Sequence, residues 1–355
     1  MTPLLFTPLK LRGLTFKNRI FVSPMCQYSS VEGVPNNWHL VHLGSRAVGG
    51  AAMVTVEATA VRDTGRISPG DLGIYNEKQV EAFRPITQFI REHGAIAGIQ
   101  LAHAGRKASM GAPWQGGKRV EISDGGWIPE APSAIPFAPH YHTPKELSIA
   151  EIDDIVDDFV NAAKRALEAG FQVIEIHMAH GYLLNEFLSP LSNHRKDEYG
   201  GPIENRMRLP LSVAKAVREV WPTELPILVR ISATDWAPEE GWDLDQSLVL
   251  TRALIKAGID MIDCSSGGTL EHPVIPLGPG YQVPFAERIR KDTGIPTSAV
   301  GLIVNAAQAE AILREGKADV VSMAREFLRD PYFPLHAAKE LGVDVPWPAQ
   351  YLRAK

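Results

Sequence analysis

Cysteines and long apolar runs are both scarce in this chain, and each scarcity excludes a class of protein. Two of the 355 residues are cysteines, too few for a disulfide framework or a cysteine-ligated iron–sulfur cluster. No segment approaches the roughly 20 apolar residues that a transmembrane helix needs. The first ten residues include two prolines and no apolar segment typical of a secretory signal. We therefore expect a soluble, cytoplasmic protein without a membrane partner.

The chain also has no excess of basic residues. The 36 lysines and arginines stand against 41 aspartates and glutamates, a net charge of −5, which argues against a nucleic-acid partner. The dinucleotide-binding pattern G-x-G-x-x-G is also absent, since its nearest match, residues 278–280, lacks the third glycine. What is present is a 45% share of hydrophobic residues, enough for a large core. These features favour an enzyme that acts on small molecules.

A repeating pattern of buried strands and helices organises the chain. Residues 169–177, 257–265 and 316–324 each contain a helix end, a glycine and an apolar strand. We count eight strand candidates, most of them separated by helical patterns, which is typical of a (β/α)₈ TIM barrel. An open doubly wound sheet is the alternative, and the missing glycine motif disfavours it. We predict one barrel domain over residues 1–355, with an N-terminal hairpin cap, an unstructured insert after the third strand at residues 107–147 and a C-terminal arm at residues 343–355.

One strand leads directly into a cluster of chemically active side chains. The apolar residues 171–176 are followed by His177, His180 and Tyr182, and barrel enzymes carry their sites at the C-terminal ends of strands. Two imidazoles could donate hydrogen bonds to one developing oxyanion, with a tyrosine as proton donor. They could instead bind a metal ion, which would require a third ligand such as a carboxylate. A purely structural role at the barrel mouth is the third interpretation.

Two polar side chains interrupt other apolar strands. Arg230 lies within the apolar residues 226–231, and a buried guanidinium needs an anion or carbonyl oxygens. It could contact a ligand, or it could form an ion pair with a carboxylate such as Glu57 or Asp263. Gln100 also needs partners, and it could bind either the edge of a heterocycle or the neighbouring backbone.

Two late segments match the phosphate site of barrel enzymes, which follows strands seven and eight. Gly301 would permit close backbone approach, and Arg325 would add a positive charge at a helix N-terminus. A surface salt bridge is the alternative for Arg325. Of the two cysteines, we expect Cys264 in the core because it lies within an apolar strand. Cys26 follows a strand, and as a nucleophile it would need a neighbouring base.

Several further motifs occur in a specific order and spacing. They are Ser23-Pro24-Met25-Cys26-Gln27-Tyr28, His177-Met178-Ala179-His180-Gly181-Tyr182-Leu183, Phe187-Leu188-Ser189-Pro190, Asn193-His194-Arg195, Asp197, Tyr199-Gly200-Gly201 and Glu204-Asn205-Arg206. In this order the chain resembles, over essentially its whole length, the Old Yellow Enzyme family of flavin-dependent ene-reductases. Cys26, Tyr28 and the C-terminal residues 347–353 resemble its thermophilic-like (xenobiotic reductase) subclass.

The resemblance implies FMN as a bound cofactor and NADPH as the hydride-donating substrate. It implies that Gly301, Ala324 and Arg325 meet the phosphate of FMN. The remaining cofactor contacts that it implies are Ser23, Pro24, Met25, Cys26 and Ala58 along the ring system, Gln100 at the pyrimidine edge and Arg230 at the N1/O2 region. A fixed cation at that position would stabilise a reduced, anionic flavin.

The resemblance also implies a reaction, the reduction of the activated C=C bond of α,β-unsaturated carbonyls. His177 and His180 would hold the carbonyl oxygen, and Tyr182 would protonate the α-carbon. Cys26 would tune the flavin potential and touch the substrate, and Tyr28 would bind the substrate. Many other members of the family carry asparagine where His180 stands, so we expect a different substrate range with the same mechanism.

Two other functions are compatible with the residues alone. One is a metal-dependent barrel lyase or hydrolase with His177 and His180 as ligands. The other is a non-catalytic flavin- or phosphate-binding protein, which would have no use for the proton donor Tyr182. The subclass further implies a homo-oligomer, a dimer or a tetramer, in which Trp347 or Arg353 of the arm enters a neighbouring active site. Packing of the arm on its own barrel is the alternative.

Overall fold

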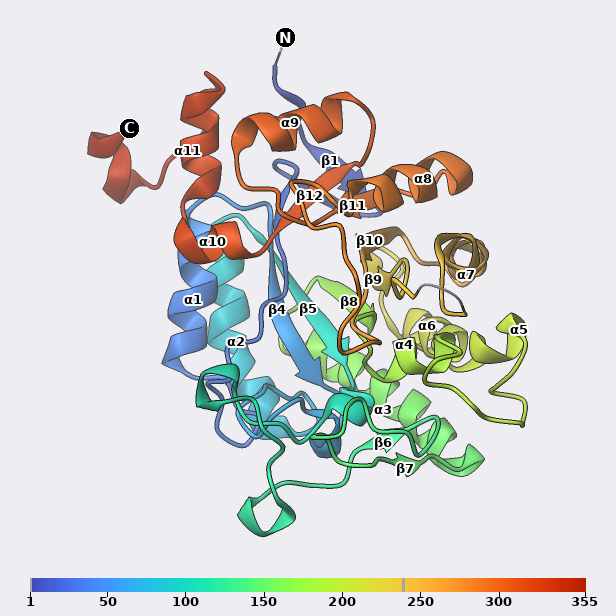
Figure 1. The fold of residues 1–355 in the computed structure, drawn as a ribbon. Coiled ribbons are helices and arrows are strands. Elements are labelled where there is room, and N and C mark those ends of the chain that lie inside the picture. The colour runs from blue at the N-terminus through green and yellow to red at the C-terminus, as the bar shows by residue number, and fades with distance from the viewer. Residues whose placement is uncertain (1, 238–239) are drawn as a thin grey trace.

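The computed structural model describes residues 2–237 and 240–355, and a closed barrel of eight parallel strands forms its centre (Figure 1). The strands follow one another around the barrel in chain order, and β12 pairs with β3 to close it. They are β3 (Ile20–Val22), β4 (Met53–Ala60), β5 (Ile96–Ala102), β8 (Val173–Met178), β9 (Ile227–Ser232), β10 (Met261–Ser265), β11 (Thr297–Ala299) and β12 (Val320–Met323). The predicted (β/α)₈ barrel is confirmed.

Helices cover the outside of the barrel (Figure 1). The longer ones are α1 (Asn37–Val48), α2 (Glu77–Glu92), α3 (Ile149–Glu168), α6 (Arg208–Val220), α7 (Leu244–Lys256), α8 (Val283–Thr293), α9 (Ala306–Arg314) and α11 (Phe333–Glu340). The short ones are α4 (Leu183–Leu188), α5 (Ile203–Arg206) and α10 (Arg325–Arg329). At the start of α3, Ser148 and Glu151 form a capping box, which satisfies two backbone donors that the first helical turn leaves free.

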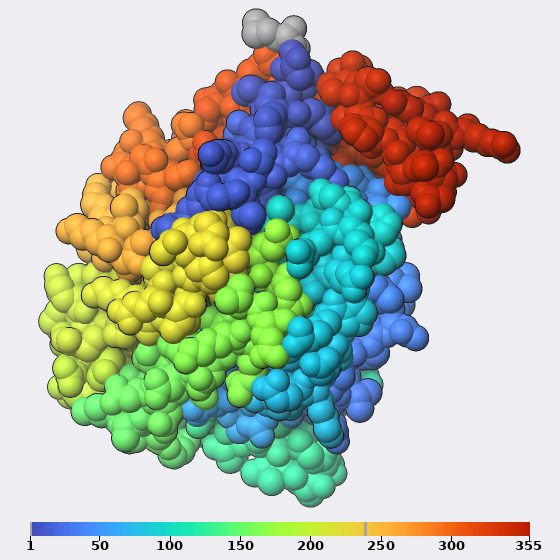
Figure 2. Space-filling model, turned by 180° about the vertical axis from the view of Figure 1, so that it is seen from behind, coloured from blue at the N-terminus to red at the C-terminus, as the bar shows by residue number. Residues whose placement is uncertain are grey.

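An antiparallel hairpin precedes the barrel, as predicted. Strands β1 (Leu9–Leu11) and β2 (Leu14–Phe16) pair with each other, and their inner residues join a small apolar cluster with residues from the N-terminal ends of the barrel strands. Within it, the rings of Phe16 and Phe21 lie 4.9 Å apart. The hairpin therefore closes the end of the barrel opposite to the C-terminal strand ends. In Figure 2 this region (dark blue) lies at the end of the molecule from which the C-terminal segment (red) projects.

The insert at residues 107–147 contains more structure than the sequence predicts. Two single-turn 3₁₀-helices and the short parallel strands β6 (Glu130–Ala131) and β7 (Lys145–Glu146) interrupt it. Its Trp127 donates a hydrogen bond of 2.7 Å from Nε1 to the carbonyl oxygen of Thr64. The prediction of an unstructured insert was therefore wrong in part, because backbone pairing and buried side chains fix it at the C-terminal end of the barrel (Figure 1).

The C-terminal arm lies at the other end of the molecule, away from the insert (Figure 1). It ends in a 3₁₀-helix (Ala349–Ala354). The Tyr351 hydroxyl lies 3.4 Å from that of Tyr332 of the same chain, and Lys355 forms an ion pair with Asp344. None of the helices in the described part of the chain is long and apolar enough to span a membrane.

The barrel interior is apolar near the hairpin and polar near the opposite end. Alternate residues of a strand face opposite sides, so that Ile174 and Ile176 of β8 join the apolar layer under the helices. The intervening side chains face inward. Four inward polar residues on neighbouring strands are at most 7% exposed: Gln100, Glu175, Arg230 and Asp263. Because buried polar groups need partners, their position below the C-terminal strand ends marks this end as the candidate site.

Candidate active site

The predicted site residues lie at the C-terminal ends of the barrel strands. Ser23 directly follows β3, Ala58 lies in β4 and Gln100 lies in β5. His177 and Arg230 lie near the ends of β8 and β9. Gly301 and Ala324 follow β11 and β12 in the same way. The C-terminal ends of parallel strands meet at one end of a barrel, so residues that are far apart in the chain share one site.

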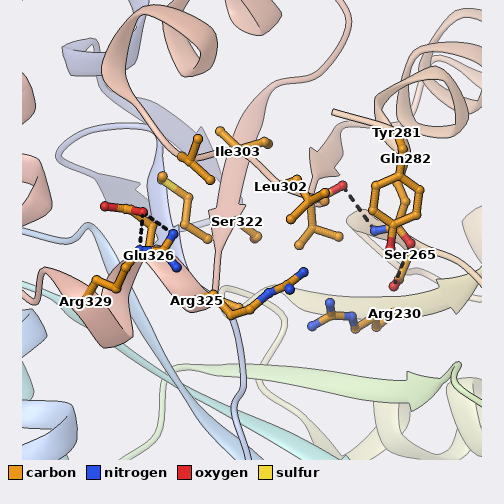
Figure 3. Close-up of a pocket in the computed structure, with 15 residues that line it drawn as sticks. Arg230, Ser265, Tyr281, Gln282, Leu302, Ile303, Ser322, Arg325, Glu326 and Arg329 are labelled. Carbon is orange, nitrogen blue, oxygen red and sulfur yellow. Dashed lines mark hydrogen bonds and ion pairs between the residues drawn. The ribbon is translucent and has the colours of Figure 1, made fainter. Parts of the chain in front are cut away.

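A cavity of about 220 Å³ opens between the ends of β9 to β12. Arg230, Gly301, Ala324 and Arg325 line it together with the loop residue Tyr281. Figure 3 shows that the side chains of Arg230 and Arg325 both point into this cavity. Within the described ranges Arg325 forms no ion pair, so the predicted alternative of a surface salt bridge is not observed. Two arginines that face one cavity favour an anionic ligand.

Gly301 adopts a conformation that requires glycine. Its φ angle is 122°, and an added Cβ would lie 3.0 Å from Nε2 of Gln282. The same nitrogen donates a hydrogen bond of 3.2 Å to the carbonyl oxygen of Val300. Any larger residue at position 301 would both strain the backbone and displace this glutamine. No side chain therefore covers the backbone at Gly301, where it borders the cationic cavity.

The two histidines of the motif lie next to each other and are fixed differently. The ring centroids of His177 and His180 are 5.1 Å apart at 82°. His180 has a φ of 64°, and Nε2 of its ring lies 2.7 Å from Oγ of Ser265. Burial, and then the positive charge of Arg230, lowers the pKa of both histidines well below the usual value. Both imidazoles are therefore neutral at neutral pH and offer one N–H donor each.

Tyr182 completes this group. Its ring lies 5.1 Å from that of His177, and with Ala58 it lines a small separate hollow. Burial, followed by the nearby Cys26 and Tyr28, raises the pKa of Tyr182 well above its ordinary value. The phenol thus stays protonated through the neutral range, which suits a proton donor.

Cys26 is a half-buried thiol beside carboxyl groups. Burial, and then the charges of Asp71 and Glu57, raises the pKa of Cys26 well above that of a free cysteine. No histidine is among the groups that act on it. Because the thiolate is the nucleophile, this environment disfavours covalent catalysis. Cys264, in contrast, is fully buried in β10 as predicted.

Tyr28 lies on the same loop in a left-handed backbone conformation, with a φ of 50°. Its ring meets the edge of Trp114 from the insert, with centroids 5.5 Å apart. Burial, and then Cys26, raises the pKa of Tyr28, so its hydroxyl is protonated. The insert thereby contributes a wall next to the predicted substrate-binding tyrosine.

The polar interior residues bind each other. Nε2 of Gln100 donates a hydrogen bond of 2.7 Å to Oε1 of Glu175, so its partner is a side chain and the predicted alternative of neighbouring backbone is wrong. Nε of Arg230 lies 3.5 Å from Oδ2 of Asp263. The ion pair predicted as one alternative for Arg230 therefore exists with Asp263. Arg230 nevertheless also lines the cationic cavity, so both interpretations apply to it.

Lys107, for which the sequence predicts no role, is part of the site. Its Nζ donates hydrogen bonds to the carbonyl oxygens of His180 (2.9 Å) and Gly268 (3.1 Å), and it lies 5.2 Å from the ring centroid of Tyr182. Burial, and then Arg106, lowers the pKa of Lys107 to about 8. The sequence signal that could have indicated Lys107 is the basic pair Arg106-Lys107, shortly after the end of β5.

Ser265 was missed as well, although it connects the two halves of the site. It lines the cationic cavity and also contacts Nε2 of His180. The cavity and the histidines would otherwise belong to separate regions, because neither histidine lines the cavity. A serine at the end of an apolar strand gives no distinctive pattern, so the sequence offered no signal for it.

The geometry does not favour the metal-dependent alternative. Within the described residues, no group of three or more histidine, cysteine, aspartate or glutamate side chains could hold a metal ion. His177 and His180 thus lack the third protein ligand that a catalytic zinc site uses.

Two buried polar atoms at the strand ends have no hydrogen-bond partner in the described part of the chain. They are Oγ of Ser23 and Nδ1 of His177. Buried polar groups are nearly always paired, so a pair of unpaired ones at one end of a barrel indicates a ligand-binding site. Together with the cationic cavity, the neutral imidazoles and the phenol, it indicates a barrel enzyme whose site suits an anionic ligand.

Comparison with known proteins identifies the family. The family described as "NADH:flavin oxidoreductase / NADH oxidase family" matches residues 4–343. An NADPH dehydrogenase of Geobacillus sp. (strain WCH70) is 50% identical over 355 residues, which cover 99% of each chain. The chain therefore belongs to the NADH:flavin oxidoreductase (Old Yellow Enzyme) family, as the resemblance predicted.

Solved structures agree with this assignment. Morphinone reductase in complex with tetrahydroNAD is 28% identical, with a TM-score of 0.79 and coverage of 98% of this chain and 93% of that one. The old yellow enzyme homologue of Zymomonas mobilis is also 28% identical, with a TM-score of 0.79 and coverage of 98% and 95%. The chain is thus a flavin oxidoreductase with the barrel of this family.

Proposed function

We propose that this enzyme binds FMN, takes hydride from NADPH and reduces the activated C=C bond of α,β-unsaturated carbonyls and related electrophiles. The observation that carries the proposal is the position of Ser265. It joins a cationic cavity suited to a cofactor phosphate to a pair of neutral imidazoles beside a protonated phenol. The names of the similar proteins, an NADPH dehydrogenase and a reductase bound to tetrahydroNAD, support the choice of reductant.

The residues fit FMN. Gly301, Ala324 and Arg325 would hold its phosphate. All three line the cavity, no side chain covers the backbone at Gly301, and Arg325 forms no ion pair within the described residues. The contacts proposed along the ring system are Ser23, Pro24, Met25, Cys26 and Ala58, with Gln100 and Arg230 from below. Oγ of Ser23, which is buried and has no hydrogen-bond partner in the described part of the chain, supports this placement. When bound, FMN would supply the hydride that it accepts from NADPH.

His177 and His180 would bind the substrate carbonyl oxygen. Neutral imidazoles suit this task because they donate hydrogen bonds without giving up a proton, and the negative charge that develops on the oxygen strengthens those bonds. The hydrogen bond between Ser265 and Nε2 of His180 would fix one ring. Burial, then Arg230, and to a smaller extent the charge of Lys107, lower the pKa of both imidazoles and keep them neutral.

Tyr182 would deliver the proton to the α-carbon, and Tyr28 would hold the substrate from the opposite side. Both phenols are protonated because burial raises their pKa values. The insert at residues 107–147 and the loop at residues 267–281 would form the remaining walls. His140 of the insert lies 3.7 Å from Glu271 of the loop, so the two segments meet.

For Cys26→Ala we expect an altered flavin midpoint potential with activity retained. The thiol is protonated, so the substitution removes a polarizable group without removing a nucleophile. The change in turnover should stay far below the roughly 10⁶-fold loss that follows removal of a catalytic nucleophile. Spectroelectrochemistry and steady-state kinetics on the same preparation would check this. Complete inactivity of the flavin-loaded variant would point to covalent chemistry at Cys26.

We further propose that the enzyme is a cytoplasmic homo-oligomer of the thermophilic-like subclass, a dimer or a tetramer. The arm at residues 343–355 supports this proposal, because it lies far from its own strand ends and projects from the molecule (Figure 2). Trp347 or Arg353 could then reach the site of a neighbouring copy. The Tyr351 hydroxyl lies 3.4 Å from that of Tyr332, so the terminal 3₁₀-helix of the arm also contacts its own chain.

The visible absorption spectrum of the purified protein tests the central proposal. We expect a flavin spectrum that bleaches on anaerobic addition of NADPH and returns when an enone is added. Protein that carries no flavin, and gains none when mixed with FMN, would overturn the proposal. A flavin that bleaches but does not return with any enone would leave the cofactor correct and the substrate class wrong.

A further inference from the structure

The carboxyl group of Glu57 is buried beside the site, but the proposed mechanism does not use it. Glu57 of β4 is 3% exposed. It is one of the two carboxylates that the sequence offers as partners of Arg230, but the ion pair forms with Asp263. The pairing of β4 with β5 shifts between Val56 and Ala58, so Glu57 falls outside the register of the two strands. Irregularities of this kind redirect side chains next to active sites.

The carboxyl group of Glu57 binds the loop that follows β3. Its Oε1 accepts a hydrogen bond of 3.0 Å from the backbone N–H of Gln27, 30 positions earlier in the chain. Gln27 stands between Cys26 and Tyr28, the two residues of this loop that would touch the substrate. The hydrogen bond therefore attaches the substrate-facing part of the loop to a strand of the barrel.

Tyr28 needs such an attachment because its backbone conformation is unfavourable. Its φ angle is 50°, in the left-handed region that a bulky residue adopts only when its surroundings hold it there. Gly70 supports the following part of the loop, since its carbonyl oxygen accepts a hydrogen bond of 2.8 Å from the N–H of Ser30. An added Cβ at Gly70 would lie 2.7 Å from the carbonyl oxygen of Tyr28. The loop is thus held on both sides of Tyr28.

Trp38 of α1 attaches the same loop from the protein surface. Its Nε1 donates a hydrogen bond of 3.0 Å to Oε1 of Gln27, and Nε2 of Gln27 donates one of 2.8 Å to the carbonyl oxygen of Met25. Gln27 is therefore held through its backbone by Glu57 and through its side chain by Trp38. Because Trp38 is 57% exposed, its N–H can be removed with little disturbance of the core.

We propose that Glu57 is a positioning residue that holds the Cys26–Tyr28 segment in place through the backbone of Gln27, with Trp38 as a second attachment. Without the carboxyl oxygen, the N–H of Gln27 loses its partner. The unfavourable conformation of Tyr28 is then less well held, and its ring binds ligands less tightly. The proposal rests on the function proposed above, in which Tyr28 holds the substrate.

Glu57→Met removes the hydrogen-bond acceptor and keeps a side chain of similar length. In the full-length, FMN-loaded protein, we expect the affinity for a phenol to fall by about twofold to tenfold, the factor that one net hydrogen bond contributes. Titration of the flavin absorption with the phenol measures this affinity. Unchanged phenol affinity in folded, flavin-loaded Glu57→Met would overturn the proposal.

Glu57→Gln is the conservative variant, and its amide oxygen can still accept the hydrogen bond from Gln27. Burial raises the pKa of Glu57 well above its usual range, so an uncharged amide is a close substitute. We expect phenol affinity within about twofold of the wild type, less than the loss of one net hydrogen bond. A loss as large as that in Glu57→Met would contradict the role of the acceptor oxygen.

A double-mutant cycle with Tyr28→Ala tests whether Glu57 acts through the tyrosine. If it does, Glu57→Met should lower phenol affinity much less in the Tyr28→Ala background than in the wild type, because coupled residues are not additive. Equal losses in both backgrounds would show that Glu57 acts on the fold as a whole, and the positioning role would be wrong.

Glu310→Met is the matched control. Glu310 of α9 is also buried, at 8% exposed, and its carboxylate accepts hydrogen bonds from the backbone N–H groups of Leu4 (3.0 Å) and Leu5 (2.8 Å). This variant should lower the thermal stability of the protein and leave phenol affinity unchanged. An equal loss of phenol affinity in Glu310→Met would overturn the proposal, since any buried carboxylate that binds backbone would then produce the effect.

Trp38→Phe keeps the test decisive if Glu57→Met does not fold. It removes only the indole N–H that reaches Gln27, and we expect a loss of phenol affinity in the same direction. Unchanged affinity in this variant would contradict the attachment of the loop through Gln27. Failure of the wild-type protein to bind FMN would instead refute the proposed function itself.

Discussion

Tyr182→Phe should slow the reduction of an enone by about 100-fold to 10,000-fold, the range that loss of a general acid produces. The flavin should still be reduced by NADPH at nearly the wild-type rate, because that step needs no proton from the phenol. Burial raises the pKa of Tyr182, so the wild-type oxidative rate should not fall between pH 6 and pH 9 through ionisation of this group. Stopped-flow measurement of the two half-reactions separates the effects.

Tyr199→Phe is a suitable control for the removal of a phenol. Tyr199 is 9% exposed and packs against Phe187, away from the histidines. This variant should leave both half-reactions unchanged. If Tyr182→Phe slowed both half-reactions equally, the phenol would be acting on the flavin or on the fold, and the role of proton donor would be wrong.

The fold could be predicted because its signals are local. Most barrel strands are apolar runs that follow a helix end, and the capping box at Ser148 and Glu151 marks the start of α3. The hairpin follows from two short apolar pieces next to each other. The site residues could be located for the same reason, since polar side chains at strand ends are visible in the sequence and the barrel brings those ends together.

The partners within the site could not be predicted, because they depend on register between distant strands. Gln100 and Glu175 are 75 positions apart, and only the pairing of β5 with β8 places them side by side. Lys107 is likewise 73 positions from His180, whose carbonyl oxygen it contacts. The sequence therefore predicts which residues need partners, and the barrel geometry determines which partners they find.

The same distinction explains why Arg230 allowed two interpretations that both hold. A buried guanidinium has donors on more than one side, so an ion pair does not exclude a ligand contact. Asp263 lies near Nε on the barrel side, while the end of the side chain points into the cavity (Figure 3). Arg230 thus connects the polar interior to the proposed cofactor site.

His177→Ala should weaken the binding of phenolic ligands, which resemble an enolate, and should slow enone reduction by about 100-fold to 1,000-fold. This is the usual loss when one donor to an oxyanion is removed. His177 is 3% exposed and neutral, because burial and then Arg230 lower its pKa. It therefore contributes a hydrogen bond without a charge, and phenol affinity should show no histidine titration across neutral pH. Titration of the flavin absorption with a phenol measures the affinity directly.

His177→Asn and His42→Ala make this test specific. Asparagine retains an N–H donor, so His177→Asn should recover part of the lost affinity, which a purely structural role for the imidazole would not predict. His42 is another buried histidine, 7% exposed on α1, and its removal should leave phenol binding unchanged even if it lowers stability. Unchanged phenol affinity in His177→Ala would exclude His177 from the oxyanion site and leave His180, held by Ser265, as the donor there.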